Sequence, residues 1–268
     1  MTYKDKILII DDEQVILDAV TKIVSSENLE VDSATNAADA LDKLSHKKYS
    51  LILCDIMMPE MDGFQLLDEL YNRKNKTPVV MITGYSTVEN AVNSLSKGAI
   101  DFIPKPFTFE EISSSISRGL KFNRIALKLE KAKKNGSDET VVFVSCPLKY
   151  KRLGHISWMN LESEGLAVIG VSDLYLETIS DVKKIELSEV EDIIIQGNSC
   201  SKFETSDGLI HTCLAPLGGR IIERNEKLLS EPTLLEKDPY FQGWLYKIIP
   251  SDIEYEMKYL IAGGSDIL

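Results

Sequence analysis

A short apolar run that stops at a carboxylate places the strongest constraint on the fold of this chain. Residues 51–54 read Leu-Ile-Leu-Cys and lead directly into Asp55, and a proline and an Asp-Gly pair follow by residue 63. Such a run, bounded by turn residues, is typical of a strand buried on both faces of a parallel sheet. Ligands bind at the carboxyl ends of these strands. Asp55 is therefore a candidate functional residue, although an aspartate after a strand also commonly caps a turn.

The same pattern recurs three times in the first half of the chain. The other runs are residues 6–10 before Asp11-Asp12-Glu13, residues 79–82 before Thr83-Gly84, and residues 100–103 before Pro104-Lys105-Pro106. Amphipathic helical segments separate the runs, at residues 13–26, 36–46, 63–73 and 86–97. This alternation predicts an α/β fold in which helices cover both faces of a parallel sheet. Five such units favour the doubly wound, flavodoxin-like strand order 2-1-3-4-5.

The residues at the four strand ends are suited to phosphoryl transfer. Asp11, Asp12 and Asp55 offer the oxygen ligands that Mg²⁺ prefers. A carboxylate can itself act as a nucleophile and form an aspartyl-phosphate. Phosphoryl transfer depends on positioning and charge neutralisation, which Lys105 and the Thr83 hydroxyl could supply.

Residues 5–122 resemble the receiver domain of two-component response regulators in the order and spacing of their motifs. The matching motifs are Asp11-Asp12, Asp55, Met58-Pro59 with Asp62-Gly63, Thr83-Gly84, Gly98-Ala99, Phe102 and Lys105-Pro106. The resemblance implies a phosphoacceptor without other enzymatic activity, phosphorylated on Asp55 by a sensor histidine kinase or a phosphotransfer protein.

The resemblance also implies roles for individual residues. Asp11, Asp12, Asp55 and the Met57 carbonyl would hold Mg²⁺, and Thr83 and Phe102 would act as switch residues. Lys105 would complete the phosphorylation site, and its bond to Pro106 would be cis. Because Met57 and Tyr85 are bulky and cannot orient a hydrolytic water, we expect a long-lived phosphate.

Length, cysteine spacing and charge limit the classes of protein to which this chain can belong. A chain of 268 residues suits two domains. It shows no signal peptide and no run of about 20 apolar residues, so we expect a cytoplasmic protein without a membrane partner. The four cysteines lack the paired spacing of a zinc site and are expected to be reduced thiols. Residues 135–268 carry 12 Lys+Arg against 22 Asp+Glu, a net charge of −10 that disfavours a nucleic-acid partner.

The fifth helix predicted by the sequence is longer than a receiver needs. It begins near Thr108, and the first stop signal is Asn135-Gly136. The surplus either pairs with a copy of itself or forms a rigid spacer. We therefore expect a receiver domain at residues 1–123, a helical extension at 124–138 and a second domain at 139–268, with a homodimer through the fourth and fifth helices as one assembly.

The second half changes to short strand signals separated by turn residues. The signals lie at residues 140–145, 155–159, 166–171, 193–195, 209–213, 220–223 and 245–249, with short helices at 173–180 and 254–262. This pattern predicts an all-β sandwich or a small barrel with minor helices.

Residues 150–262 resemble the glycine cleavage system H-protein. The segments that carry the resemblance begin at His155, Gly170, Gly218 and Pro232, and the most specific is Asp238-Pro-Tyr followed by Gly243-Trp244. The resemblance implies a lipoyl-type barrel-sandwich hybrid fold. Counting back from Pro216, the position of the family's lipoyl lysine is Gly208, within a predicted Asp-Gly turn at residues 205–209. The nearest lysine, Lys202, lies several residues away along the strand.

Together these features predict a response regulator whose non-lipoylated H-protein-like domain acts through protein–protein interaction with an unknown target. The alternative is a metabolic carrier of glycine cleavage regulated by a receiver, although a carrier needs a tethering amine that Gly208 does not provide. A third alternative is that the second domain is only a dimerisation or spacer unit. The hairpin at residues 205–209 is the expected docking surface for a partner.

Overall fold

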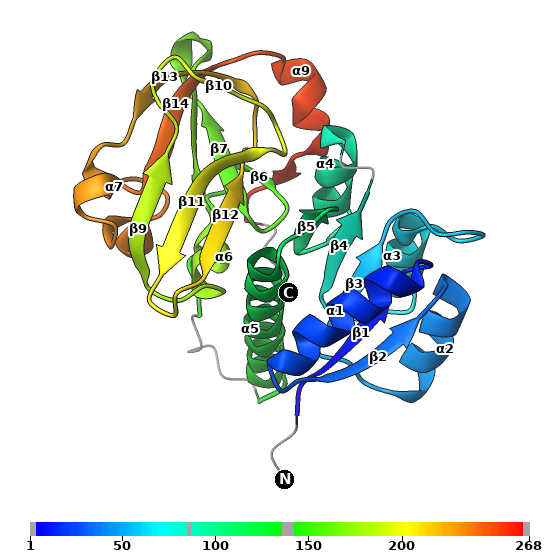
Figure 1. Ribbon diagram of the computed structural model, residues 1–268. Coiled ribbons are helices and arrows are strands. Elements are labelled where there is room, and N and C mark those ends of the chain that lie inside the picture. The colour runs from blue at the N-terminus through cyan, green and yellow to red at the C-terminus, as the bar shows by residue number, and fades with distance from the viewer. Residues whose placement is uncertain (1–3, 85–86, 136–141, 265–268) are drawn as a thin grey trace.

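A computed structural model of the chain describes residues 4–84, 87–135 and 142–264 (Figure 1). Within residues 4–135 five parallel strands and five helices alternate. The strands are β1 (Lys6–Ile10), β2 (Glu30–Ala34), β3 (Leu51–Asp55), β4 (Val79–Thr83) and β5 (Asp101–Pro104). The helices are α1 (Gln14–Ser26), α2 (Ala37–His46), α3 (Gly63–Asn72), α4 (Val88–Ser96) and α5 (Phe109–Asn135). The strand order is β2-β1-β3-β4-β5, which confirms the predicted doubly wound topology.

The apolar composition of the central strands explains their position in the sheet. Every residue of β3 and β4 is buried, because helices cover both faces. One core cluster joins β1, β3 and β4 to α1 and α5, and a second joins the same strands to α2 and α3. Local signals set the helix starts: Asp62 and Gln65 form a reciprocal capping box at α3, and the Thr87 side chain caps α4.

The second domain, which the structure describes from residue 142 to 264, is built from two antiparallel sheets. The larger has the order β10-β13-β14-β8-β7-β6-β15 and the smaller β12-β11-β9. Its strands are β6 (Lys151–Leu153), β7 (Ser157–Leu161), β8 (Ala167–Val171), β9 (Val182–Leu187), β10 (Ile193–Ile194), β11 (Ser199–Thr205), β12 (Ile210–Leu214), β13 (Gly219–Arg224), β14 (Trp244–Pro250) and β15 (Ile261–Ala262). The short helices are α6 (Asp173–Glu177), α7 (Lys227–Ser230), α8 (Leu234–Lys237) and α9 (Ile253–Glu256). The predicted all-β second domain is thus confirmed.

Three local predictions differ from the structure. The strand expected at residues 140–145 is absent from its described part, 142–145, where the Val144 N–H donates to the Asp173 carboxylate at 2.5 Å instead of to a strand. The strands β6 and β9 were not predicted, because β6 has only three residues and β9 has only Val182 and Ile185 buried, whereas β11 was expected only as one arm of the predicted hairpin. The helix expected at residues 254–262 is divided into α9, a 3₁₀ turn at Met257–Tyr259 and β15.

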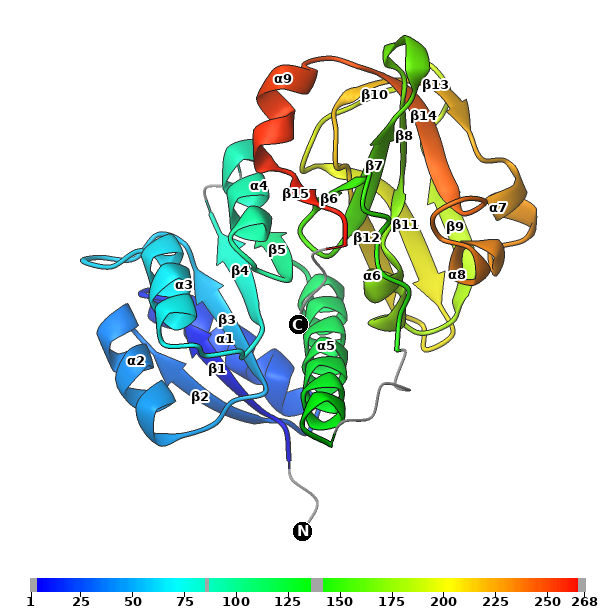
Figure 2. The ribbon, with the colours of Figure 1, turned by 180° about the vertical axis from the view of Figure 1, so that it is seen from behind.

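The second domain packs against α4, β5 and α5 of the first, and the view from behind shows α9 and β15 beside α4 (Figure 2). Val92 and Leu95 of α4 belong to the core cluster of the second domain, and Leu174 of α6 belongs to a core cluster of the first. Two glycines with left-handed backbone permit the close approach. A Cβ on Gly154 (φ +54°) would lie 3.1 Å from Leu95 Cβ, and one on Gly197 (φ +77°) would lie 3.1 Å from Val92 Cγ2. The two domains therefore share apolar core.

Candidate functional site

The carboxyl edge of the parallel sheet brings together Asp11, Asp55 and Lys105, which lie 44 to 94 residues apart in sequence. The two carboxylates are 2% and 3% exposed. Lys105 Nζ lies 2.7 Å from Asp11 Oδ2 and 2.9 Å from Asp55 Oδ1, and so it bridges them. These residues follow β1, end β3 and follow β5, because parallel strands place their carboxyl ends at one edge.

Burial and charge act against each other in this cluster. Burial raises the pKa of Asp11, and the hydrogen bond from Lys105 only partly offsets this effect. Burial also raises the pKa of Asp55. Lys105 lowers this pKa in part, and repulsion from Asp11 raises it further. Burial would lower the pKa of Lys105, but its two carboxylate partners outweigh that effect and the pKa is raised. Two buried carboxylates share one ammonium, so the edge can accept further positive charge.

Asp12 and Met57, the other residues predicted to bind Mg²⁺, lie next in sequence to Asp11 and close to Asp55, respectively. Asp12 is exposed, and the Met57 N–H donates to Asp55 Oδ2 at 2.6 Å. Among the described residues, no three His, Cys, Asp or Glu side chains converge closely enough to hold a metal. The donors still fit Mg²⁺, which binds through one or two carboxylates and retains several waters. The assignment of Asp11, Asp12, Asp55 and the Met57 carbonyl as ligands therefore stays a prediction.

The predicted switch residues Thr83 and Phe102 lie on the neighbouring strands β4 and β5. Thr83 is fully buried at the end of β4, and its carbonyl accepts the Lys105 N–H at 2.7 Å. The Lys105–Pro106 bond is cis, as predicted. Phe102, half-buried on the edge strand β5, lines a cavity between the domains. Tyr85, expected to flank the phosphate, lies outside the described residues.

The contact between the domains has a polar part that the sequence did not reveal. Arg118 of α5 is buried, forms an ion pair with Asp101, and lies over the ring of Tyr175 in the second domain, 4.7 Å from its centroid. The Ser114 hydroxyl donates to the carbonyl of Ile210 in β12 at 2.8 Å. The neighbouring His211 is 1% exposed, and neither of its ring nitrogens has a hydrogen-bond partner among the described residues. No signal in the sequence indicated this burial, because Arg118 lies off the apolar stripe of the helix that includes Ile112, Ile116 and Leu120.

The hairpin at residues 205–209 joins β11 to β12 and lies close to α5. Gly208 adopts φ +81°, consistent with the predicted Asp-Gly turn. The Asp207 carboxylate accepts from Ser180 Oγ at 2.5 Å and Thr205 Oγ1 at 2.6 Å. Lys121 Nζ of α5 lies 3.8 Å from the same carboxylate. The hairpin predicted as a docking surface is therefore already in contact with the first domain.

Comparisons with known proteins match two different families to the two parts of the chain. Residues 7–117 match the response regulator receiver domain, and residues 148–265 match the glycine cleavage H-protein. The regulatory protein AtoC of Escherichia coli is 36% identical over 120 residues, which are 45% of this chain and 26% of AtoC. The transcriptional regulatory protein HprR of the same organism is 36% identical over 116 residues, 43% of this chain and 52% of HprR. The chain thus spans between a quarter and about half of these relatives.

Two solved structures are similar to parts of the chain. The glycine cleavage system H protein from Mycobacterium marinum is 25% identical, covers 39% of this chain and 86% of its own, and has a TM-score of 0.37. The receiver domain of NtrX from Brucella abortus is 38% identical and covers 43% of this chain and 98% of its own, with a TM-score of 0.42.

The two family matches show a response regulator receiver domain fused to an H-protein-like domain. A receiver domain is typically a phosphoacceptor rather than an enzyme, it implies a histidine kinase partner, and such domains generally bind Mg²⁺. Within the part of the chain that the structure describes, no helix is long and apolar enough to cross a bilayer.

Proposed function

We propose that this protein is a two-component response regulator, phosphorylated on Asp55, whose H-protein-like domain acts by binding another protein. The receiver comprises residues 1–123, the helical extension 124–138 and the output domain 139–268. The observation that carries the proposal is the shared core, in which Val92 and Leu95 of α4 pack inside the output domain. A change in α4 cannot occur without disturbing that packing, because protein interiors are close-packed.

The chemistry of the acceptor follows from the cluster at the sheet edge. An Asp55 carboxylate oxygen attacks phosphorus, and the phosphoryl group leaves its donor. Lys105, already in contact with Asp55, neutralises charge that develops on the phosphoryl oxygens. Bound Mg²⁺, held by Asp11, Asp12 and the Met57 carbonyl, would offset the repulsion between the phosphate and the carboxylates. The Thr83 hydroxyl binds one phosphoryl oxygen.

The switch connects this site to the domain interface. When Thr83 turns toward the phosphate, Phe102 turns inward from the cavity that it lines between the domains. This change removes an aromatic contact next to α4 and α5, on which the output domain rests. Phosphorylation can shift the equilibrium only through contacts that differ between the two states, and the Thr83, Phe102 and α4 contacts meet that condition.

The output is the surface that separation of the domains would uncover. In the closed arrangement Asp207 is held by Ser180 and faces Lys121 of α5. Separation frees the hairpin at residues 205–209 for a partner. A homodimer through α4 and α5 would require the same separation, since the output domain covers that face.

The proposed output is docking and not group transfer. Gly208 cannot be acylated, and Lys202 lies within β11, lining the cavity between the domains. Intact mass measured after co-expression with a lipoate ligase should show no lipoyl adduct. An adduct on Lys202 would support a carrier instead.

Hydrogen exchange followed by mass spectrometry tests the switch. Treatment with acetyl phosphate and Mg²⁺ should increase exchange in β12 and at residues 196–199, because these segments contact α4 and α5. Asp55→Asn should abolish both the acyl-phosphate adduct and the increase. Asp18→Asn is the matched control and should retain both, because Asp18 is exposed on α1 and its hydrogen-bond partner Gln14 lies in the same helix. Labelling of Asp55→Asn, or labelling of the wild type without a change in exchange, would contradict the proposal.

A further inference from the structure

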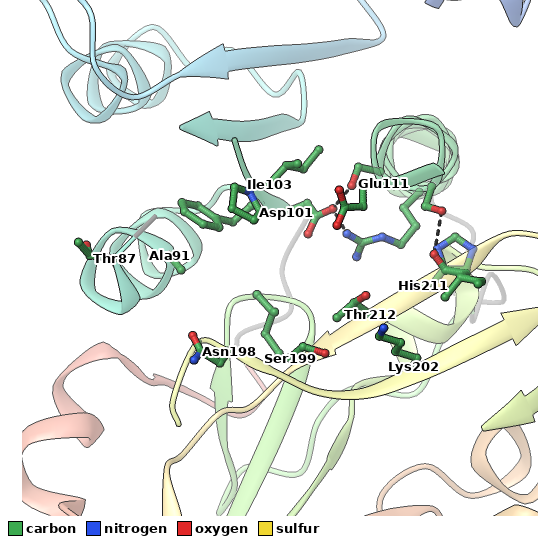
Figure 3. Close-up of a pocket in the computed structure, with 18 residues that line it drawn as sticks. Thr87, Ala91, Asp101, Ile103, Glu111, Asn198, Ser199, Lys202, His211 and Thr212 are labelled. Atoms are coloured by element: carbon green, nitrogen blue, oxygen red, sulfur yellow. Dashed lines mark hydrogen bonds and ion pairs between the residues drawn. The ribbon is translucent and has the colours of Figure 1, made fainter. Parts of the chain in front are cut away.

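A cavity of about 410 Å³ lies between the receiver and the output domain, away from the Asp55 cluster. Its receiver wall comes from α4, β5 and α5, and its other wall from β11, β12 and the loop before β11 (Figure 3). Cavities of roughly 300–1,000 Å³ at domain interfaces are common small-molecule sites. At about 30 Å³ for each water-sized group, this one has room for roughly a dozen non-hydrogen atoms.

The charges that line this interdomain cavity do not all have partners. Asp101 and Arg118 neutralise each other in a buried ion pair. Glu111 accepts the N–H of Thr108 at the start of α5, where the helix dipole favours a negative charge. The exposed Lys202 side chain has no ion pair or hydrogen bond with the described residues.

The position of Lys202 in the sheet explains why its charge is unpaired. Its cross-strand neighbours are Thr212 on one side and Glu186 on the other. Glu186 already forms an ion pair with Lys184 at 2.9 Å. The Lys202 ammonium is therefore the cationic group of the cavity wall that remains available to a ligand.

The rest of the wall combines apolar surface with hydrogen-bonding groups. Ala91, Phe102, Ile103, Ile210 and Leu214 contribute apolar atoms. The wall also includes His211, an uncharged ring with an unpartnered donor and an unpartnered acceptor, and the hydroxyl residues Ser199 and Thr212.

We propose that this interdomain cavity binds a small organic carboxylate with an apolar body. The carboxylate pairs with Lys202, and the body packs against the apolar residues of α4, β5 and β12. Since the ligand touches both domains and Phe102, it stabilises the closed arrangement. This second part rests on the proposed function, in which phosphorylation of Asp55 opens the domains. Because the ligand favours the closed arrangement, phosphorylation lowers the affinity for the ligand, and the ligand disfavours opening by the same factor.

Three probes with equal numbers of non-hydrogen atoms test the site by titration calorimetry on the full, unphosphorylated chain: hexanoate, hexanamide and heptylammonium. We expect hexanoate to bind at least fivefold more tightly than the other two. Lys202→Gln should remove that preference, whereas Lys183→Gln, an exposed lysine in the neighbouring strand β9, should keep it. Equal binding of all three probes, or an unchanged preference in Lys202→Gln with the fold intact by circular dichroism, would overturn the site.

Measurements on the full chain and its Asp55→Asn variant distinguish the cavity site from the proposed function. Asp55→Asn cannot be phosphorylated but should bind hexanoate as the wild type does, because Asp55 lies outside the cavity wall. Loss of the carboxylate preference with normal phosphorylation would overturn the cavity site alone. Normal hexanoate binding in a wild-type protein that takes no phosphate would overturn the proposed function alone.

Discussion

Replacing His211 with phenylalanine should reduce the amount by which the free energy of unfolding of the output domain falls at acidic pH. His211 is 1% exposed, and burial, together with the nearby Arg118 guanidinium, lowers its pKa from 6.5 to about 3. Lys121 lowers this pKa further, whereas Asp207 and Asp101 act in the opposite direction. The folded protein therefore holds the ring neutral at pH values at which the unfolded chain protonates it.

The sign and size of the effect follow from linkage. Because the unfolded state binds the extra proton, this contribution to stability is complete above pH 6.5 and is lost as the pH falls toward 3. One pKa unit corresponds to about 1.4 kcal/mol, so the free energy of unfolding should fall by about 1.4 kcal/mol at pH 5.5 and by about 2 kcal/mol at pH 5.0 through His211 alone. His211→Phe keeps an aromatic ring, larger by one ring atom, and cannot titrate.

Urea unfolding followed by tryptophan fluorescence measures this quantity, since both tryptophans, Trp158 and Trp244, lie in the output domain. The loss of unfolding free energy between pH 7.5 and pH 5.5 should be about 1.4 kcal/mol smaller in His211→Phe than in the wild type. His46→Gln, at the exposed end of α2, is the control and should behave as the wild type. The same loss in all three proteins would refute the reasoning, because buried carboxylates contribute equally to each.

Two further substitutions test the packing and the charge balance. Lys105→Ala leaves the buried carboxylates of Asp11 and Asp55 without their shared cation. The free energy of unfolding at pH 7 should therefore fall by about 3–5 kcal/mol, and Mg²⁺ should restore part of it. Urea unfolding followed by circular dichroism measures this change. Wild-type stability of this variant without metal would disprove that balance. Gly170→Ala should destabilise the output domain by about 1–3 kcal/mol, because the new Cβ would lie 2.4 Å from Cζ2 of the buried Trp158 ring. Thermal unfolding monitored by tryptophan emission checks this, and an unchanged midpoint would count against it.

The sequence alone predicted the receiver fold and the residues at its edge. Each central strand is a continuous apolar run, and the residue that ends it must lie at the common carboxyl edge of a parallel sheet. By this rule the sequence alone predicts that Asp11, Asp55 and Lys105 lie close together. The sequence predicted the strands of the output domain less completely, because β6 has only three residues and β9 has only two buried side chains.

The surplus length of α5 shows where sequence reasoning ended. Its apolar stripe was compatible with pairing to a second copy or with a spacer. In the structure Ile125 of the surplus shares a core cluster with Leu174 of the output domain of the same chain, and Leu129 packs against that cluster. A helical stripe indicates that a partner surface exists but does not identify it, because any apolar face can satisfy it.

What the sequence determined, therefore, was everything governed by local periodicity and sheet geometry: the doubly wound receiver, its acidic edge and the glycine turn at residues 205–209. Only the tertiary structure decided how the two domains meet. Ser114 and Ile210 are 96 residues apart, and no local pattern relates them. The stacking of Arg118 on Tyr175, the enclosure of His211 and the place of Lys202 in the interdomain cavity arise from that contact. Burial and partners, not residue type, set the energy of a charged or polar group.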